Sequence, residues 1–131
     1  SLQLLVEADQ IHFTYSCYPE QLVFRGDRNM VDQMLINLLR NAHEATEQTA
    51  SPQIRIDARQ EGDSVRITVS DNGCGISAEA MGKVFIPFYS TKSGGSGIGL
   101  SLCRQMMLLH KGSVSLLSDG EGTAITLQFP V

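Results

Sequence analysis

Residues 37–45 of the chain read NLLRNAHEA, and two glycine-rich segments follow, DNGCG at residues 71–75 and GSGIGL at residues 95–100. The first segment holds two asparagines at i and i+4, a spacing that puts both on one side of a helix. The second offers one carboxylate, Asp71, at a tight turn, and the third places glycines just before a helix. Together the three motifs suit a magnesium–nucleotide site, although no one of them alone would establish it.

The composition describes a folded domain. The chain has 131 residues, of which 42% are hydrophobic and 18% are charged, and its net charge is −4. This length predicts one domain, residues 1–131, with enough apolar residues for a core. The mild acidity argues against a nucleic-acid partner, which would favour a basic stripe. No apolar run has the length of a membrane span, and the first residues lack the basic start of a signal peptide.

The cysteines are Cys17, Cys74 and Cys103. Their odd number and wide spacing match neither a metal site nor a secreted disulfide framework. We therefore expect reduced thiols, as in a cytosolic domain, and a redox role for Cys74 is the weaker alternative.

A long amphipathic helix is predicted from Asp27, a plausible N-cap, to about Glu47. At about 100° per residue, five apolar residues fall within roughly 40° of one direction. This predicted core stripe consists of Val31, Leu35, Leu38, Ala42 and Ala45. Asn37, Asn41 and Glu44 share an arc of about 60° beside it, where a cleft would run.

The remaining elements predict an α+β fold. Alternating residues indicate strands at 11–17, 53–59, 64–70, 113–117 and 123–129, with a short extended piece at 21–24. Helices are expected from Ser77 through Val84 and from Gly97 to His110, the latter ended by Lys111 and Gly112. The hairpins at 53–70 and 113–129 favour a mixed, mainly antiparallel sheet with helices on one face, a two-layer α/β sandwich.

The two asparagines are unusual because an interior amide competes with the helix backbone. Magnesium prefers oxygen ligands and takes one or two from the protein beside substrate phosphates. The Asn41 amide oxygen fits that pattern and adds no negative charge. A hydrogen-bonded asparagine pair that braces a loop is an equally good explanation of this motif taken alone.

The glycine segment at 71–75 has two interpretations. Asp-Asn-Gly is a common hairpin turn, but here the chain leads towards a helix and not a second strand. A carboxylate at a strand end can instead accept a hydrogen bond from an exocyclic amine, which adenine has and guanine replaces with a carbonyl. Asp71 is therefore a candidate base-reading residue.

The segment at 95–100 suits phosphate. Glycines before a helix let backbone N–H groups and the helix N-terminus cradle an anion, and Lys92 adds a positive charge. No Gly-Lys-Ser/Thr closes the loop, so it is not a Walker motif, and the spacing is wrong for a dinucleotide fingerprint. A flexible linker is the alternative for a glycine cluster by itself. The aromatic run 85–89 is interpreted as core packing or a lid hinge, and residues 106–109 as core.

With these motifs in order, the sequence resembles the catalytic ATP-binding domain of bacterial sensor histidine kinases, in the GHKL superfamily with gyrase, MutL proteins and the ninety-kilodalton chaperones. The sequence of residues 37–45 most resembles that of the nitrogen-regulation branch. The resemblance implies Asn41 as the magnesium ligand, Asp71 as the adenine-binding aspartate, Lys92 at the phosphate end, and Thr123 as a residue that holds adenine through water. The residues predicted to contact ATP are Asn37, Asn41, Glu44, Ala45, Asp71, Gly73, Gly75, Ile76, Phe88, Thr91, Lys92, Gly95, Ser96, Gly97, Gly99, Leu100 and Thr123.

The resemblance also implies a reaction and partners. Hydrolytic relatives carry a general-base Glu at the position of Asn37, so its absence suits transfer to a histidine, whose neutral imidazole already offers a lone pair. We expect γ-phosphoryl transfer from MgATP, with Asn41 and Lys92 acting at the reacting phosphate. The acceptor would be a histidine on a separate dimerisation domain. In the family this histidine stands in a His-Glu/Asp context followed by Pro, and none of the three histidines here has that context. A response regulator would act downstream. The domain would be cytoplasmic without direct membrane contact, whether or not its parent is membrane-anchored. The alternatives are a regulatory ATP-binding module and a hydrolytic ATPase.

Overall fold

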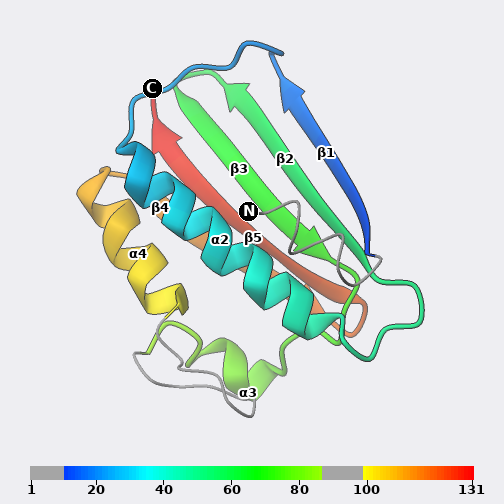
Figure 1. Ribbon diagram of the computed structural model, residues 1–131. Coiled ribbons are helices and arrows are strands. Elements are labelled where there is room, and N and C mark those ends of the chain that lie inside the picture. The colour runs from blue at the N-terminus through cyan, green and yellow to red at the C-terminus, as the bar shows by residue number, and fades with distance from the viewer. Residues whose placement is uncertain (1–10, 87–98) are drawn as a thin grey trace.

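The computed structural model describes residues 11–86 and 99–131. Its sheet has five strands, in the order β1-β2-β3-β5-β4 (Figure 1). The strands are β1 (His12–Tyr18), β2 (Gln53–Glu61), β3 (Ser64–Asp71), β4 (Ser113–Asp119) and β5 (Gly122–Pro130). β1 pairs with β2 in parallel and the other pairs are antiparallel, which confirms the mixed, mainly antiparallel sheet.

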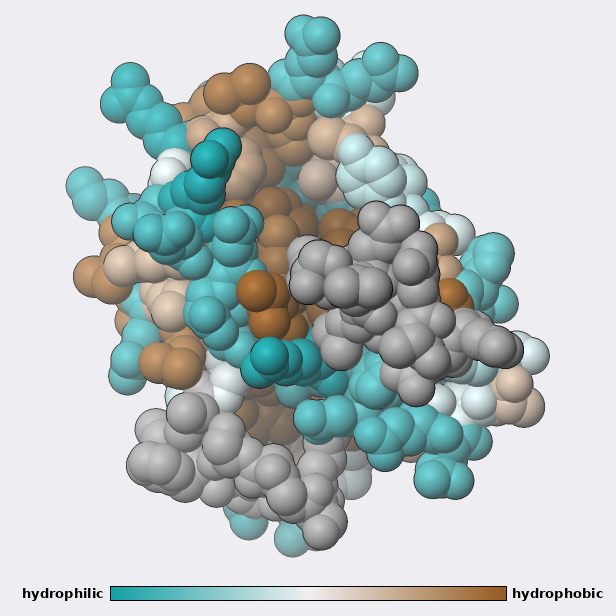
Figure 2. Space-filling model, viewed as in Figure 1, coloured by the Kyte–Doolittle hydropathy of each residue, from teal (hydrophilic) through white to brown (hydrophobic). Residues whose placement is uncertain are grey.

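Three described helices complete the fold: α2 (Arg28–Ala45), α3 (Ala78–Met81) and α4 (Gly99–Leu109). α2 lies across one face of the sheet with α4 beside it, which confirms the two-layer arrangement (Figure 1). From the same side, hydrophobic residues reach the surface in patches among hydrophilic ones (Figure 2). Within residues 11–86 and 99–131, no helix combines the length and apolar character needed to cross a membrane.

Helix α2 begins where the sequence predicts. The Asp27 carboxylate accepts a hydrogen bond from the Met30 N–H at 3.0 Å, and such a cap is worth about 1 kcal/mol. The helix ends at Ala45, two residues before the predicted end. Its buried residues are Met34, Leu38, Leu39 and Ala42, so the core stripe is centred slightly to one side of the predicted one, with Val31 and Leu35 only partly buried.

The core lies between α2 and the two central strands. Alternate residues of β3 and β5 face the helices and pair across the sheet: Val65 with Phe129, Ile67 with Leu127, and Val69 with Ile125. All six are buried. This ladder of apolar pairs fixes the register, because a slip of one residue would turn every pair towards solvent.

Some element predictions were wrong. Residues 21–24 form no strand; Leu22 and Phe24 pack against the core instead, and their apolar character had suggested a strand. The helix capped by Ser77 ends at Met81 and not at Val84, because Gly82 caps it.

The prediction that residues 106–109 are core holds only in part. Met107 is fully buried, but Leu108 and Leu109 are 66% and 71% exposed. Consecutive residues point about 100° apart around a helix, so four apolar residues in a row cannot all face one core.

Helix α4 ends at Leu109, just before the predicted limit, and Lys111 takes the left-handed conformation at φ 60. The Gly112 N–H then bonds the Met107 carbonyl at 2.8 Å, which closes the helix end. Gly112 is needed for a different reason: a Cβ there would lie 2.2 Å from the Gln128 carbonyl oxygen.

Candidate nucleotide site

A row of polar side chains continues the core ladder at the end of the sheet. After Val69–Ile125, the next pair on the helix-covered face is Asp71 with Thr123, and Thr123 pairs in turn with Ser118 of β4. Residues opposite each other in antiparallel strands have neighbouring side chains. The alternation that buries the core therefore also gathers a carboxylate and two hydroxyls at the edge of that core.

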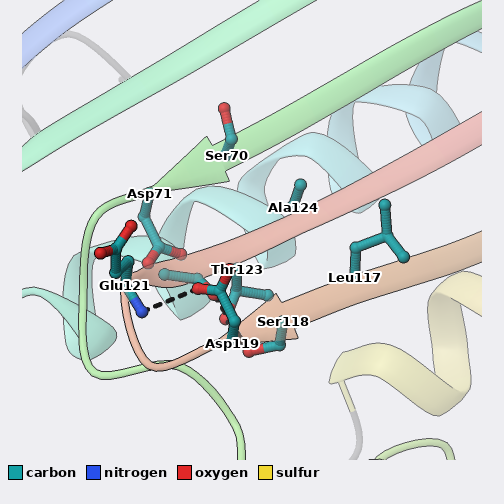
Figure 3. A pocket seen from close by; sticks show the side chains of 9 residues that line it. Ser70, Asp71, Leu117, Ser118, Asp119, Glu121, Thr123 and Ala124 are labelled. Carbon is teal, nitrogen blue, oxygen red and sulfur yellow. Dashed lines mark hydrogen bonds between the residues drawn. The ribbon is translucent and has the colours of Figure 1, made fainter.

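The polar row borders an open hollow of about 500 Å³. Its lining residues are Ser70, Asp71, Leu117, Ser118, Asp119, Glu121, Gly122, Thr123 and Ala124. Figure 3 shows them at the ends of β3 and β5 and around the β4–β5 turn, where the Glu121 N–H donates to the Asp119 carboxylate at 2.7 Å. Successive strand residues point to opposite faces, so the hollow reaches both sides of the sheet end.

The first glycine segment is held between α2 and the β4–β5 turn. The Cys74 N–H donates to the Ala45 carbonyl at 3.2 Å, and a Cβ on Gly73 would lie 2.3 Å from that same oxygen. At Gly75, φ is 76° and a Cβ would lie 1.8 Å from the Asp119 carbonyl oxygen. Glycine is required at both positions because the backbones approach closely.

Two polar side chains set the path of this segment. The Asn72 amide accepts from the Gln53 N–H at 2.8 Å and donates to the Ser51 carbonyl at 2.9 Å, so it ties the segment to the start of β2. The Asp71 carboxylate accepts from the Gly73 N–H at 2.9 Å. No strand follows, since the chain continues to α3, and the hairpin interpretation of this motif is therefore wrong.

The candidate site extends along helix α2 from the polar row towards α4. Ala45, Asn41 and Asn37 are spaced by four residues and so lie on one side of the helix. Asn37 faces the start of α4, where a Cβ on Gly99 would lie 3.8 Å from the Asn37 Cβ. Eight residues of helix span about 12 Å, which separates the two ends of this candidate site.

The Asn37 amide packs inside the helix pair. Its oxygen accepts from the Gln33 side chain at 3.3 Å, and its nitrogen is buried with no hydrogen-bond partner among residues 11–86 and 99–131. The neighbouring Cys103 thiol is fully buried, with its sulfur 3.9 Å from the Met34 carbonyl oxygen. Burial raises the pKa of Cys103 to about 11, against a smaller lowering effect of the Asn37 amide. The thiol is therefore protonated at neutral pH, and all three cysteines are free.

Most predicted site residues lie along this path. Ala45, Asp71, Gly73, Gly75, Ile76 and Thr123 cluster around the glycine segment. Asn41 and Asn37 follow along α2, Gly99 and Leu100 begin α4, and Glu44 is exposed on α2. The predictions for Phe88, Thr91, Lys92, Gly95, Ser96 and Gly97 fall outside the described residues.

The sequence reasoning missed Ser118 and Gly122. Gly122 has φ 146, and a Cβ there would lie 2.0 Å from the Asp71 carbonyl oxygen. Ser118 occupies a helix-facing position in β4, where the preceding positions are Val114 and Leu116. A polar residue that interrupts an apolar alternation was the available signal.

The side chains present fit an adenine nucleotide with magnesium. The polar row offers a carboxylate and hydroxyl acceptors, and Asn41 offers a neutral oxygen of the type that magnesium accepts beside phosphates. Residues 11–86 and 99–131 contain no cluster of three His, Cys, Asp or Glu side chains that would hold a metal by themselves.

Comparison with known proteins shows the family of the chain. Residues 26–131 match the family described as histidine kinase-, DNA gyrase B-, and HSP90-like ATPase. The signal transduction histidine-protein kinase AtoS of Escherichia coli (strain K12) is 39% identical over 108 residues, covering 81% of this chain and 17% of AtoS. The chain thus spans about a sixth of the length of AtoS and of two further curated sensor proteins that it matches.

The solved structures include the catalytic domain of histidine kinase ThkA. It has a TM-score of 0.87 and 30% identity, over 98% of this chain and 88% of that domain. ThkA in complex with the response regulator protein TrrA has a TM-score of 0.81 and 30% identity, over 98% of this chain and 38% of the solved chain. The chain belongs to the histidine kinase-, DNA gyrase B-, and HSP90-like ATPase family, and within it to the catalytic ATP-binding domains of sensor histidine kinases.

Proposed function

We propose that this domain binds MgATP and transfers the γ-phosphoryl group to a histidine on a separate dimerisation domain. The proposal rests on the polar row, in which Asp71 pairs with Thr123. Residues 37–45 of helix α2 connect this row with the N-terminus of α4. One end presents acceptors suited to adenine. The other presents a helix start, whose N–H groups and dipole favour phosphate.

Each side chain then has a defined task. Asp71 accepts a hydrogen bond from the adenine amine, and Thr123 supports the base beside it. Asn41, halfway along the path, would hold magnesium through its amide oxygen; a bound magnesium ion would neutralise phosphate charge during transfer. With the phosphates and acceptor positioned, the protein contributes placement and charge stabilisation.

The surroundings of Asn37 favour transfer over hydrolysis. A hydrolytic site needs a general base to take a proton from water. Asn37 cannot act as one, and its amide is engaged with Gln33 and buried against α4. A histidine acceptor needs no such base because its neutral imidazole has a lone pair at neutral pH.

A solved relative supports the proposal for the partners. ThkA was solved with a response regulator protein, and we propose that a response regulator likewise takes the phosphoryl group from the parent of this chain. The phosphoacceptor domain of the parent kinase would be the direct substrate. The domain itself would work in the cytoplasm.

The test is a phosphotransfer assay with γ-labelled ATP and a purified dimerisation domain that carries the acceptor histidine of a sensor kinase. We expect acid-labile, base-stable label on the dimerisation domain and none on this chain alone. Asp71→Ala should abolish labelling and nucleotide binding, whereas Asp63→Ala, in the exposed β2–β3 turn, should not. ATP binding without any transfer would favour a regulatory module, and rapid release of phosphate by the domain alone would favour an ATPase.

A further inference from the structure

The Ser118 hydroxyl sits at the centre of three hydrogen bonds. It accepts from the Ile76 N–H at 2.7 Å, it donates to the Gly122 carbonyl at 3.1 Å, and it lies 2.9 Å from the Thr123 hydroxyl. It therefore joins the first glycine segment and the β4–β5 turn to Thr123, its neighbour in the polar row.

Counting protons fixes the direction of the third bond. A serine hydroxyl has one proton to donate and two lone pairs to accept with. The Gly122 carbonyl can only accept, so it takes the Ser118 proton. The bond between the two hydroxyls then requires the Thr123 proton, and Ser118 uses its two lone pairs for Ile76 and Thr123.

We infer that Ser118 is a positioning residue that makes the Thr123 hydroxyl a pure acceptor towards the bound base. Thr123 lines the hollow and is 8% exposed, so its remaining lone pairs are directed to a ligand or to a water on it. This inference rests on the proposed function and deepens it.

The consequence is selection of adenine over guanine. Asp71 and Thr123 are cross-strand neighbours, and with the Thr123 proton engaged both present only lone pairs. The exocyclic amine of adenine can donate to them. Guanine carries a carbonyl at the same position, and its oxygen would face two acceptors with no proton to form a hydrogen bond. A site with fixed polarity rejects a mismatched partner strongly because its buried groups are left unpaired.

The experiment measures the ratio of the dissociation constants for MgGTP and MgATP. Calorimetric titrations of the whole chain with MgATP and MgGTP give the preference for adenine in the native protein and in Ser118→Ala. Without Ser118 the Thr123 hydroxyl can rotate and donate to the guanine carbonyl, so the preference should fall about tenfold, the usual scale for one hydrogen bond. A purely structural loss would weaken both nucleotides equally and leave the ratio unchanged.

The matched control is Ser115→Ala, on the same strand but facing away from the helices, which should keep the native ratio. Ser118→Thr keeps the hydroxyl and should restore the preference. If Ser118→Ala proves unfolded by circular dichroism, Ser118→Cys, which weakens the same bonds at similar volume, takes its place with the same expectation.

A double variant sharpens the assignment. Thr123→Val removes the hydroxyl that Ser118 is inferred to orient, so adding Ser118→Ala to it should change the ratio no further. An undiminished adenine preference in Ser118→Ala, or additive effects in the double variant, would overturn the inference. A native chain that binds neither nucleotide would instead refute the proposed function.

Discussion

At the scale of single residues, Asn41 stands one helical turn before Ala45, whose carbonyl oxygen anchors the first glycine segment. It also stands one turn after Asn37, which adjoins the start of α4. This position lies between the proposed base end and the proposed phosphate end, which is what a ligand to a phosphate-bound ion requires.

Asn41→Ala should therefore remove most of the magnesium dependence of ATP binding while leaving ADP binding without magnesium nearly unchanged. Titrations with and without magnesium measure this difference directly. Gln48→Ala, an exposed amide beyond the end of α2, is the control and should behave as the native protein. Native magnesium dependence in Asn41→Ala would show that the ion is held elsewhere.

Cys103 leads to a prediction about how the free energy of unfolding depends on pH. Its pKa is raised from 9.0 to about 11, so between these values the folded chain keeps a proton that the unfolded chain loses. This contribution to the free energy of unfolding is complete below pH 9 and declines as pH rises towards 11, by up to roughly 2–3 kcal/mol.

Urea unfolding of the native chain and of Cys103→Ala across this range checks the prediction. The native chain should be the more stable at neutral pH, because the variant leaves a cavity, and its advantage should shrink as the thiol ionises in the unfolded state. Parallel stability curves for the two proteins would contradict the assigned pKa.

At the scale of elements, the first glycine segment depends on close backbone contact. Gly75→Ala would add a Cβ 1.8 Å from the Asp119 carbonyl oxygen at φ 76, so the segment must move away from the β4–β5 turn. Gly62→Ala is a matched control, since φ there is 59 and an added Cβ would have no atom of the described residues within 4 Å.

The control should lose about 1–2 kcal/mol from the left-handed backbone alone. Gly75→Ala should lose more and should also weaken nucleotide binding, because the Ile76 N–H leaves Ser118 with the segment. Urea unfolding and calorimetry measure the two effects. Equal losses in both variants, with binding intact, would mean that the contact with Asp119 has no energetic role.

The elements also show how far the sequence could predict this site. The position of Asp71 was predictable because apolar alternation along β3 continues to a carboxylate and then breaks at glycines. Ser118 has the same local pattern, but its role depends on pairing with Thr123 across a turn and on contact with Ile76, 42 positions away. Contacts at that separation follow from the register of the sheet, which no local pattern contains.

Burial was predictable only where one face was clearly defined. Helix α2 has a polar side and an apolar side, and its buried stripe came out nearly as expected. Leu108 and Leu109 belong to an unbroken apolar run, in which composition does not indicate the direction of the core. Residues 21–24 have strand-like composition but pair with no strand in the part of the chain that the structure describes, and pairing decides whether a strand forms.

At the scale of the whole molecule, stability should be concentrated in the centre of the sheet. β3 and β5 each pair on both sides and carry six buried apolar residues between them, whereas β1 and β4 are edges. Amide hydrogen exchange should thus be slowest in β3 and β5 and faster along β1, where Tyr15 and Tyr18 are exposed.

Exchange measured residue by residue by NMR tests this order, and saturating MgATP should add protection mainly at residues 71–76 and at the β4–β5 turn. Slowest exchange in β1 would refute the central position of the core. Ligand-induced protection confined to residues far from the polar row would refute the assigned binding path.

The close packing of residues 73–75 against the β4–β5 turn has a consequence for synthesis on the ribosome. Ser118, Gly122 and Thr123 lie in β4 and β5, which are made well after α2 and β3. A growing polypeptide would contain Asn37 and Asn41 long before the proposed adenine-binding surface was complete. Capture of ATP should consequently wait until β5 has been made, and a translation intermediate stalled before β5 should bind none.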